Sequence, residues 1–600
     1  MLDKTPTARV QAFLDRFGGA LEAGRIDEAV NMFAEECYWR DLVTFTWNLK
    51  TAEGRSEVRD MLEAQLALTK PTAWQVAEGE EASEADGVTQ AWITFETAVA
   101  RGYGLIRLKD GLIWTLLTTM VELKGHEEKS GFSRPLGAKH GINPGGKTWK
   151  EEREEEAATL GYTKQPYVVI IGGGQGGIAL GARLRQLGVP TIIVERNDRP
   201  GDSWRKRYKS LCLHDPVWYD HLPYIDFPKN WPVFAPKDKI GDWLEMYAKA
   251  MELNFWGATE AKQASYDETT QTWTVDVERD GKRVTLQPQH LVLATGMSAK
   301  PNVPRFPGQD IFTGIQQHSS EHRGPDEMAG KKVAVVGSNN SAHDICAALA
   351  ENGVDVTMIQ RSSTHISKSD SLMKHALGPL YSEEAVARGI TTEKADLINA
   401  SIPYGLAPEF QKPAFDAIRE EDADFYQALE NAGFMLDFGA DDSGLFMKYL
   451  RRASGYYIDV GASQLIIDGK IKLESGSQVK ALTENKVVLE DGREIQADAV
   501  IYATGYGSMN GWAADLISQD VADKVGKVWG LGSDTPKDPG PWEGEQRNMW
   551  KPTQQDNLWF HGGNLAQSRH YSHYLALQLK ARMADISTPV YGLQETHHLS

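Results

Sequence analysis

Three glycines, Gly172, Gly174 and Gly177, stand at Gly-x-Gly-x-x-Gly spacing and are the residues whose pattern most directly indicates chemistry. The first glycine permits a tight turn, the second lets the backbone approach a pyrophosphate, and the third lets a helix pack against a strand. The free N–H groups at the start of that helix attract a diphosphate. The pattern therefore predicts a dinucleotide-binding turn.

A second turn of this kind begins at Gly337, where Asn339 replaces the middle glycine. The strand that follows it ends in Arg361 and Ser362 rather than in an acid. An arginine and a serine at this point suit a 2′-phosphate, so we expect NADPH to be preferred over NADH, although Arg361 could be an ordinary surface cation. The candidate ligands of this second turn are Gly337, Asn339, Asn340, Ser341, Arg361 and Ser362.

Two Ala-Thr-Gly turns follow apolar strands and supply Thr295 with Gly296 and Thr504 with Gly505. Small residues there let the chain pass close to a nucleotide or flavin. A strand and turn at 558–564 lead into a helix predicted at 567–583, and Asn564 before this third helix start could face the same cofactor.

The elements that must position these residues are strands and helices in α/β order. Apolar runs predict a strand at 168–171, a helix at 178–187 and a strand at 191–194 that ends in Glu195. An acid roughly 20 residues after the glycines suits ribose hydroxyls. We place Trp204, at the end of the next turn, at the same cofactor.

Composition limits the class of protein. A chain of 600 residues exceeds one hydrophobic core, so two to four domains are expected. A net charge of −19 argues against nucleic acid or an anionic membrane as partner. Three separated cysteines exclude a disulfide framework and a Cys-x-x-Cys pair, and we expect no metal. No signal peptide or membrane span is predicted, so a cytoplasmic protein is expected.

Residues 1–125 predict an α+β domain, with helical spacing first and strand-like runs after it. This order, with Cys37–Asp41 after the second helix and a hairpin at 107–113, resembles the NTF2-like (SnoaL-like) fold. Members of that superfamily include enzymes, ligand binders and dimerisation modules, and we interpret this domain as accessory. Asp41 could be a pocket acid or a structural residue at a strand end.

The remaining boundaries are expected as a linker at 126–165, the first part of one dinucleotide-binding domain at 166–329, a second dinucleotide-binding domain at 330–465 and the second part of the first domain with a C-terminal helix at 466–600. The irregular helical stretch 370–455 could be a lid or a packing insertion.

Residues 312–318, Phe-Thr-Gly-Ile-Gln-Gln-His, lie between the two turns and match Phe-x-Gly-x-x-x-His, the fingerprint of class B flavin-dependent monooxygenases. Over about 160–590 the chain resembles that family and is similar to Baeyer–Villiger and YUCCA-type enzymes. The resemblance implies two Rossmann-like domains, for FAD and NADP, with the second nested in the first. It implies FAD and NADPH as cofactors, with NADH possible. It also implies that His318 fixes the linker between the FAD and NADP domains.

The chemistry that the resemblance implies is a C4a-(hydro)peroxyflavin that inserts one oxygen atom of O2 into a small ketone or aldehyde, or into a soft nitrogen or sulfur. Two departures mark candidate catalytic residues. His322 replaces the Tyr, Phe or Trp that usually ends the fingerprint. His214, or Asp215 if the alignment shifts by one, stands where heteroatom-oxidising members have Asn.

Two alternatives stay open at this stage. The protein could be an NADPH oxidase or reductase that releases hydrogen peroxide, or a redox-sensing flavoprotein whose N-terminal domain binds a ligand. Disulfide reductases of the same plan are excluded by the missing Cys-x-x-Cys pair. The expected partners are a small-molecule substrate and O2, with no nucleic acid and no membrane, and we expect a homodimer.

Overall fold

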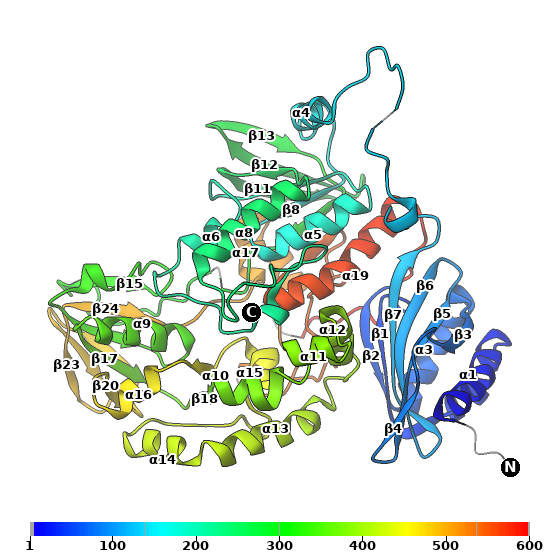
Figure 1. The fold of residues 1–600 in the computed structure, drawn as a ribbon. Coiled ribbons are helices and arrows are strands. Elements are labelled where there is room, and N and C mark those ends of the chain that lie inside the picture. The colour runs from blue at the N-terminus through cyan, green and yellow to red at the C-terminus, as the bar shows by residue number, and fades with distance from the viewer. Residues whose placement is uncertain (1–4, 139, 299, 536, 598–600) are drawn as a thin grey trace.

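The computed structural model describes residues 5–138, 140–298, 300–535 and 537–597. Figure 1 shows an N-terminal domain on one side, two further regions built on separate sheets, and a layer of helices below them. No helix in these residue ranges is long and apolar enough to cross a membrane.

The first sheet is parallel throughout, and no hairpin joins any two of its strands. Its strand order is β10-β9-β8-β14-β25. The strands span Phe255–Trp256 (β10), Thr191–Val194 (β9), Val168–Ile171 (β8), His290–Leu293 (β14) and Leu558–Phe560 (β25). The helix α5 (Gln175–Gln186) follows β8, and the long helix α19 (Leu565–Met583) packs beside α5. These bounds confirm the strands and helices predicted around the first glycine turn.

The second sheet is also parallel, with the order β15-β24-β16-β17-β20. Its strands span Ile315–His318 (β15), Ala499–Tyr502 (β24), Lys332–Val336 (β16), Asp355–Gln360 (β17) and Lys472–Ser475 (β20), and α9 (Asn340–Glu351) follows β16.

This second sheet differs from the boundaries expected for the NADP domain. Strand β15 precedes 330–465, and β20 and β24 follow it, yet all three pair within this sheet. The two Ala-Thr-Gly strands look alike in sequence, and only pairing shows that β14 lies beside β8 whereas β24 lies beside β16. The nested domain is therefore larger than the sequence pattern indicated.

The stretch between these strands is helical, as expected. It contains α10 (Ser369–Leu372), α11 (Glu383–Ala387), α12 (Thr392–Ala400), α13 (Ala407–Glu421), α14 (Ala423–Asn431) and α15 (Gly444–Arg452), and a short parallel pair, β18 (His365–Lys368) with β19 (Tyr456–Asp459), flanks it. Figure 1 shows α13 and α14 along the lower edge of the molecule.

The N-terminal sheet has the order β2-β1-β7-β6-β5-β3, with β4 (Ser83–Ala85) paired to β5. Its other elements are α1 (Pro6–Glu22), α2 (Ile26–Asn31), β1 (Phe33–Leu42), β2 (Leu49–Glu53), α3 (Gly54–Thr69), β3 (Thr72–Val76), β5 (Val88–Glu96), β6 (Ala100–Lys109) and β7 (Leu112–Leu123). The sheet is mixed rather than antiparallel throughout, because β1 pairs in parallel with β7. No hairpin joins these two strands, so nothing in the local chain forces them to be antiparallel.

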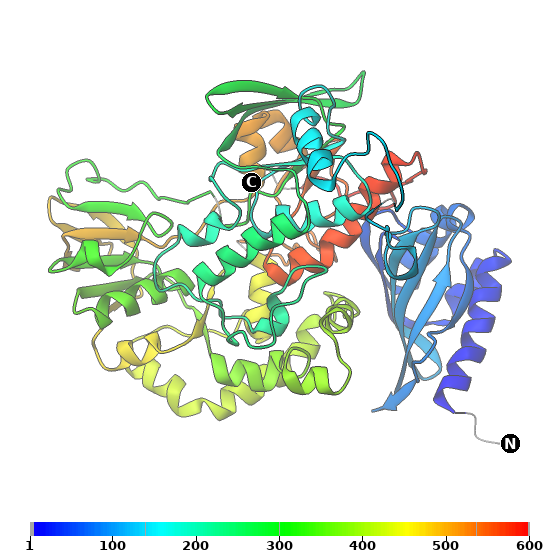
Figure 2. The same cartoon turned by 45° about the horizontal axis from the view of Figure 1, so that its top comes forward.

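One face of this sheet closes on the domain's own helices. Trp74 stacks on Phe95 with ring centroids 4.5 Å apart, and Trp39 meets Phe45 at 4.9 Å. These rings belong to one buried cluster that fills the interior. The opposite face lies against the end of α19, as Figures 1 and 2 both show.

Candidate functional site

The first glycine turn has the close contacts that its glycines predict. A Cβ added to Gly172, whose φ is +109°, would lie 2.3 Å from the Ala294 carbonyl oxygen. A Cβ on Gly177 would lie 2.0 Å from the Gly172 oxygen. A Cβ on Gly174 would meet only Ser203 Oγ, at 3.8 Å. The middle glycine thus faces open space at the start of α5, where a pyrophosphate can approach.

The residues around this turn fit FAD. Thr295 Oγ1 is buried and has no hydrogen-bond partner among the described residues, so it is available to a ligand. Glu195 Oε2 accepts the Gly173 N–H at 2.7 Å, which places this carboxylate at the glycine turn. Trp204 Nε1 donates to Gln175 Oε1 at 3.2 Å, and Gly296 has a φ of +86°.

The second turn repeats this geometry. A Cβ on Gly337, whose φ is +130°, would lie 2.3 Å from the Ala503 oxygen, as Gly172 does from Ala294. Asn339 is the N-cap residue of α9 and Ser341 lies in its first turn. Asn340 serves a structural contact, because its Oδ1 accepts the Ile458 N–H at 3.1 Å.

Basic side chains gather after β17, where Arg361 and Ser362 are exposed. Burial, with Arg452, Arg361 and Lys527 nearby, lowers the pKa of Lys537. Sequence reasoning found Arg361 but missed the other three cations, since they come from distant segments. Together they are suited to a phosphate.

His318 joins the linker between the FAD and NADP domains, which precedes β16, to the second Ala-Thr-Gly turn. Its Nε2 lies 3.1 Å from the Gly505 oxygen, which can only accept, and its Nδ1 lies 2.9 Å from Ser320 Oγ. Burial lowers the pKa of His318. Thr504 Oγ1 donates to the Asn302 oxygen, also on the linker.

His322 is buried at the end of the same linker, and burial lowers its pKa. Its Nδ1 lies 3.0 Å from Gln317 Nε2. No hydrogen bond, ion pair or ring contact between described residues joins it to His214 or Asp215. A catalytic role for His322 stays a prediction without geometric support.

Asp215 lies deep in the protein but keeps some accessible surface, as do Tyr219, Tyr449 and Tyr456. Burial raises the pKa of Asp215 and His214 opposes that shift. The Asp215 charge in turn adds to the burial that raises the pKa of Tyr456. No described residue donates a hydrogen bond to Asp215. We call Asp215 and these three tyrosines the Asp215 group.

The start of α19 connects the Asp215 group to the first glycine turn. Asn564, the N-cap residue, donates from Nδ2 to Tyr219 Oη at 3.1 Å. Tyr449 Oη donates to Gln567 Oε1 at 2.6 Å. On the other side, Gln175 Nε2 of α5 donates to the Gly563 oxygen at 3.3 Å. Sequence reasoning placed Asn564 and Asp215 but missed the tyrosines, which have no motif.

Asp41 is a structural residue rather than a pocket acid. Its Oδ2 accepts the N–H groups of Phe45 and Thr46, each at 2.9 Å, and the Thr46 hydroxyl at 2.7 Å. Its Oδ1 accepts the Thr118 hydroxyl at 2.6 Å. Burial nonetheless raises the pKa of Asp41 to about 6.

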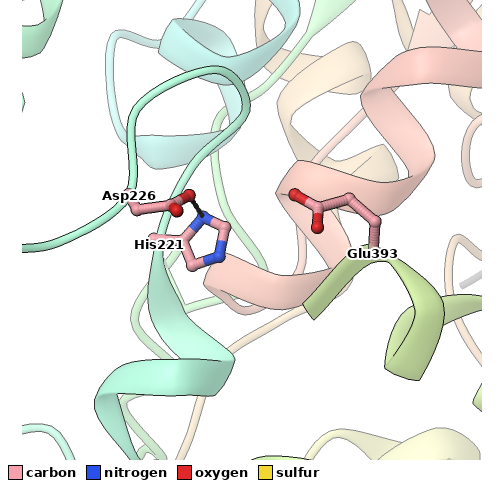
Figure 3. A group of neighbouring side chains, drawn as sticks. All are labelled: His221, Asp226 and Glu393. Carbon is pink, nitrogen blue, oxygen red and sulfur yellow. Dashed lines mark ion pairs between the residues drawn. The ribbon is translucent and has the colours of Figure 1, made fainter. Parts of the chain in front are cut away.

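Another group of described residues, His221, Asp226 and Glu393, brings metal-ligand atoms within 4.8 Å of one another (Figure 3). His221 Nδ1 lies 3.0 Å from the Leu222 oxygen and 3.5 Å from Asp226 Oδ1. A ring nitrogen facing a carbonyl carries hydrogen and cannot bind a cation. Both carboxylates are exposed, so we assign no metal here.

Comparison with known proteins agrees with this geometry. A family model described as pyridine nucleotide-disulphide oxidoreductase matches residues 169–402. The chain's three cysteines are all free. The ε-caprolactone-bound structure of cyclohexanone monooxygenase shares the fold, with a TM-score of 0.50 and 19% identity over 70% of this chain and 88% of that one.

Sequence relatives share a larger fraction of identical residues with this chain than that structure does. Indole-3-pyruvate monooxygenase YUCCA1 of Oryza sativa subsp. japonica is 33% identical over 368 residues, which cover 60% of this chain and 82% of that protein. Probable indole-3-pyruvate monooxygenase YUCCA4 of Arabidopsis thaliana is 30% identical over 350 residues, 57% of this chain and 76% of that protein. This chain therefore belongs to the class B flavin-dependent monooxygenases, enzymes that use FAD and NADPH.

Proposed function

We propose that this monooxygenase transfers one oxygen atom of O2 to the nitrogen or sulfur of a small, electron-rich substrate, and that amines are the preferred class. The observation that carries this proposal is the Asp215 carboxyl, which receives no hydrogen bond from any described residue and stands among three tyrosines. A buried carboxylate with free acceptor sites suits an ammonium group. Tyrosine rings also attract cations.

FAD would be held by Gly172, Gly174, Gly177 and Thr295, and NADPH by the turn at Gly337. When bound, FAD would accept electrons from NADPH and activate oxygen. The chain's own contribution is to place the substrate and to accept a proton. Asp215 Oδ takes a proton from the ammonium group, which leaves the nitrogen lone pair free to be oxidised. The surrounding tyrosines hold the substrate and exclude water.

A ketone or aldehyde is the second candidate substrate, because the relatives are named for indole-3-pyruvate, a 2-oxo acid. The carboxylate of such an acid would be repelled by Asp215, so we expect a neutral carbonyl compound in that case. The homodimer expected from the sequence stays a prediction, which light scattering of the purified protein can test.

The test is turnover of the FAD-loaded enzyme with NADPH and isotopically labelled O2, using a tertiary amine, a thioether and a cyclic ketone. A labelled N-oxide or sulfoxide supports the proposal. A labelled ester as the main product would favour the carbonyl candidate. Stoichiometric hydrogen peroxide with every substrate would show an oxidase instead.

A further inference from the structure

The N-terminal domain contacts the helix α12 through two buried arginines on β1 and β6, the strands on either side of β7. Arg40, on β1, donates from Nη1 to the Ala400 oxygen at 2.8 Å. Arg107, on β6, donates from Nη1 to the Ser401 oxygen at 3.0 Å and from Nη2 to Ser401 Oγ at 2.7 Å. Ala400 is the last residue of α12 and Ser401 is its C-cap. Both arginines therefore bind the C-terminal end of this helix.

The positive charges of the two arginines are compensated in different ways. Arg40 forms a two-point ion pair with Glu545, at 2.6 and 2.8 Å, and lies 4.5 Å from the Tyr404 ring. Arg107 forms no ion pair with any described residue, and burial lowers its pKa to about 10. The negative end of the α12 dipole is the compensation that its surroundings offer.

The same helix holds the segment that carries Asp215 and Tyr219, two members of the Asp215 group. Asp396 of α12 accepts two hydrogen bonds from Arg569 of α19, both at 2.9 Å. Arg569 Nη1 in turn donates to the Tyr219 oxygen at 2.7 Å and to the His221 oxygen at 2.5 Å. Asp396 also accepts from Tyr381 Oη at 2.9 Å, and this ring lies 4.8 Å from that of Tyr219. A continuous series of buried contacts thus runs from Arg107 to Tyr219.

The interior of the N-terminal domain is filled by its own aromatic rings, and Asp41 is bound by four donors. The buried arginines Arg40 and Arg107 bind instead to groups of the monooxygenase part. Because this interior is filled, it argues against the alternative in which the domain binds a ligand inside it.

We propose that Arg107 and Arg40 are positioning residues: by capping α12 they hold Asp396, Arg569 and the Tyr219 segment in the arrangement that binds substrate. The N-terminal domain thereby completes the substrate site without touching the substrate. This inference rests on the proposed function only for its kinetic readout.

The test compares Arg107→Met with Arg101→Met in the full-length, FAD-loaded protein. Arg101 lies on the same strand, is exposed and pairs with Glu122 of its own domain and Glu127 at the start of the linker, so it is the matched control. Loss of hydrogen bonds from a charged donor costs about 1.5–3 kcal/mol, so we expect substrate KM to rise about tenfold or more for Arg107→Met. More NADPH should be lost as peroxide, while anaerobic flavin reduction by NADPH keeps its rate. Arg107→Lys, which retains a cation, should restore part of the coupling between NADPH oxidation and substrate oxygenation.

Hydrogen exchange gives a readout that does not depend on catalysis. The amides of residues 395–401 should exchange faster in Arg107→Met than in Arg101→Met. Equal exchange and equal KM in the two variants would overturn the inference, whatever the wild-type substrate proves to be. If Arg107→Met does not fold, Ser401→Ala removes one Arg107 contact and should give the same changes to a smaller extent; a wild-type profile there would also overturn it. Wild-type enzyme that oxygenates nothing would instead contradict the proposed function alone.

Discussion

At the scale of single residues, the glycines of the first turn differ in what surrounds them, and this difference predicts different roles. A methyl group at Gly177 would collide with the Gly172 oxygen, which is backbone and cannot move away easily, whereas at Gly174 it would meet open space. We therefore predict that Gly177→Ala lowers the melting temperature sharply, and that Gly174→Ala folds normally but loses FAD affinity. Thermal unfolding and the flavin absorbance of the purified variants check this. A Gly174→Ala protein that keeps full flavin content would contradict it.

The role of Asp215 is tested by charge removal and pH. Asp215→Asn cannot accept the ammonium proton, so we expect kcat/KM for an amine to fall about 10- to 100-fold, the range for a hydrogen bond to a charged group. Because burial raises the pKa of Asp215, its active, ionised form is lost as pH falls through that raised value, above the usual range of an aspartate. Wild-type kcat/KM should therefore fall on the acid side.

The Asp215→Asn variant should lose this acid-side fall. Asp226→Asn, an exposed carboxyl nearby in the chain, serves as control and should keep the wild-type profile. Identical pH profiles for the wild type and Asp215→Asn would exclude Asp215 as the group that titrates.

At the scale of elements, we propose that the loop after β17 sets the preference between the two nicotinamides. Only NADPH carries a 2′-phosphate for the cations around Arg361. We predict that Arg361→Ala raises KM for NADPH about tenfold, by loss of a charged hydrogen bond, and leaves KM for NADH unchanged. Steady-state kinetics with both nucleotides measures this, with Arg388→Ala as an exposed control. A parallel rise for NADH would indicate a general structural defect.

Elements with a strong local signal were predictable from the sequence. Strands β8 and β9 and the helix between them follow from apolar runs and a glycine turn that are contiguous in the chain. Strand β24 was predicted as a strand but assigned to the wrong domain, because its partner β16 lies more than 160 residues away. Likewise Tyr449 and Tyr456 meet Asp215 only through tertiary packing. No local pattern records such a meeting, so the sequence indicated the glycine turns and Asp215 but not the tyrosines around Asp215.

At the scale of the whole molecule, the N-terminal domain is joined to the rest by a covalent linker and by a buried interface. The linker exposes Phe132 completely and most of Leu136, whereas Arg40, Arg107 and Glu545 are buried between the parts. Separating the parts would expose apolar side chains that both contribute to one core cluster, such as Leu117 and Tyr571, and would break the hydrogen bonds of Arg40 and Arg107 to the end of α12. The interface, rather than the linker, should therefore hold the two parts together.

Brief chymotrypsin treatment tests this, because the enzyme cleaves after large apolar residues and Phe132 is accessible. We predict one early cut near residues 132–136, after which both fragments elute together from a sizing column at micromolar concentration and keep monooxygenase activity. Adding 1 M salt should not separate them, since a buried ion pair is little screened. The fragments could instead separate after cutting while the larger one still uses all its NADPH for oxygenation. In that case the linker alone holds the N-terminal domain, and the substrate side forms without it.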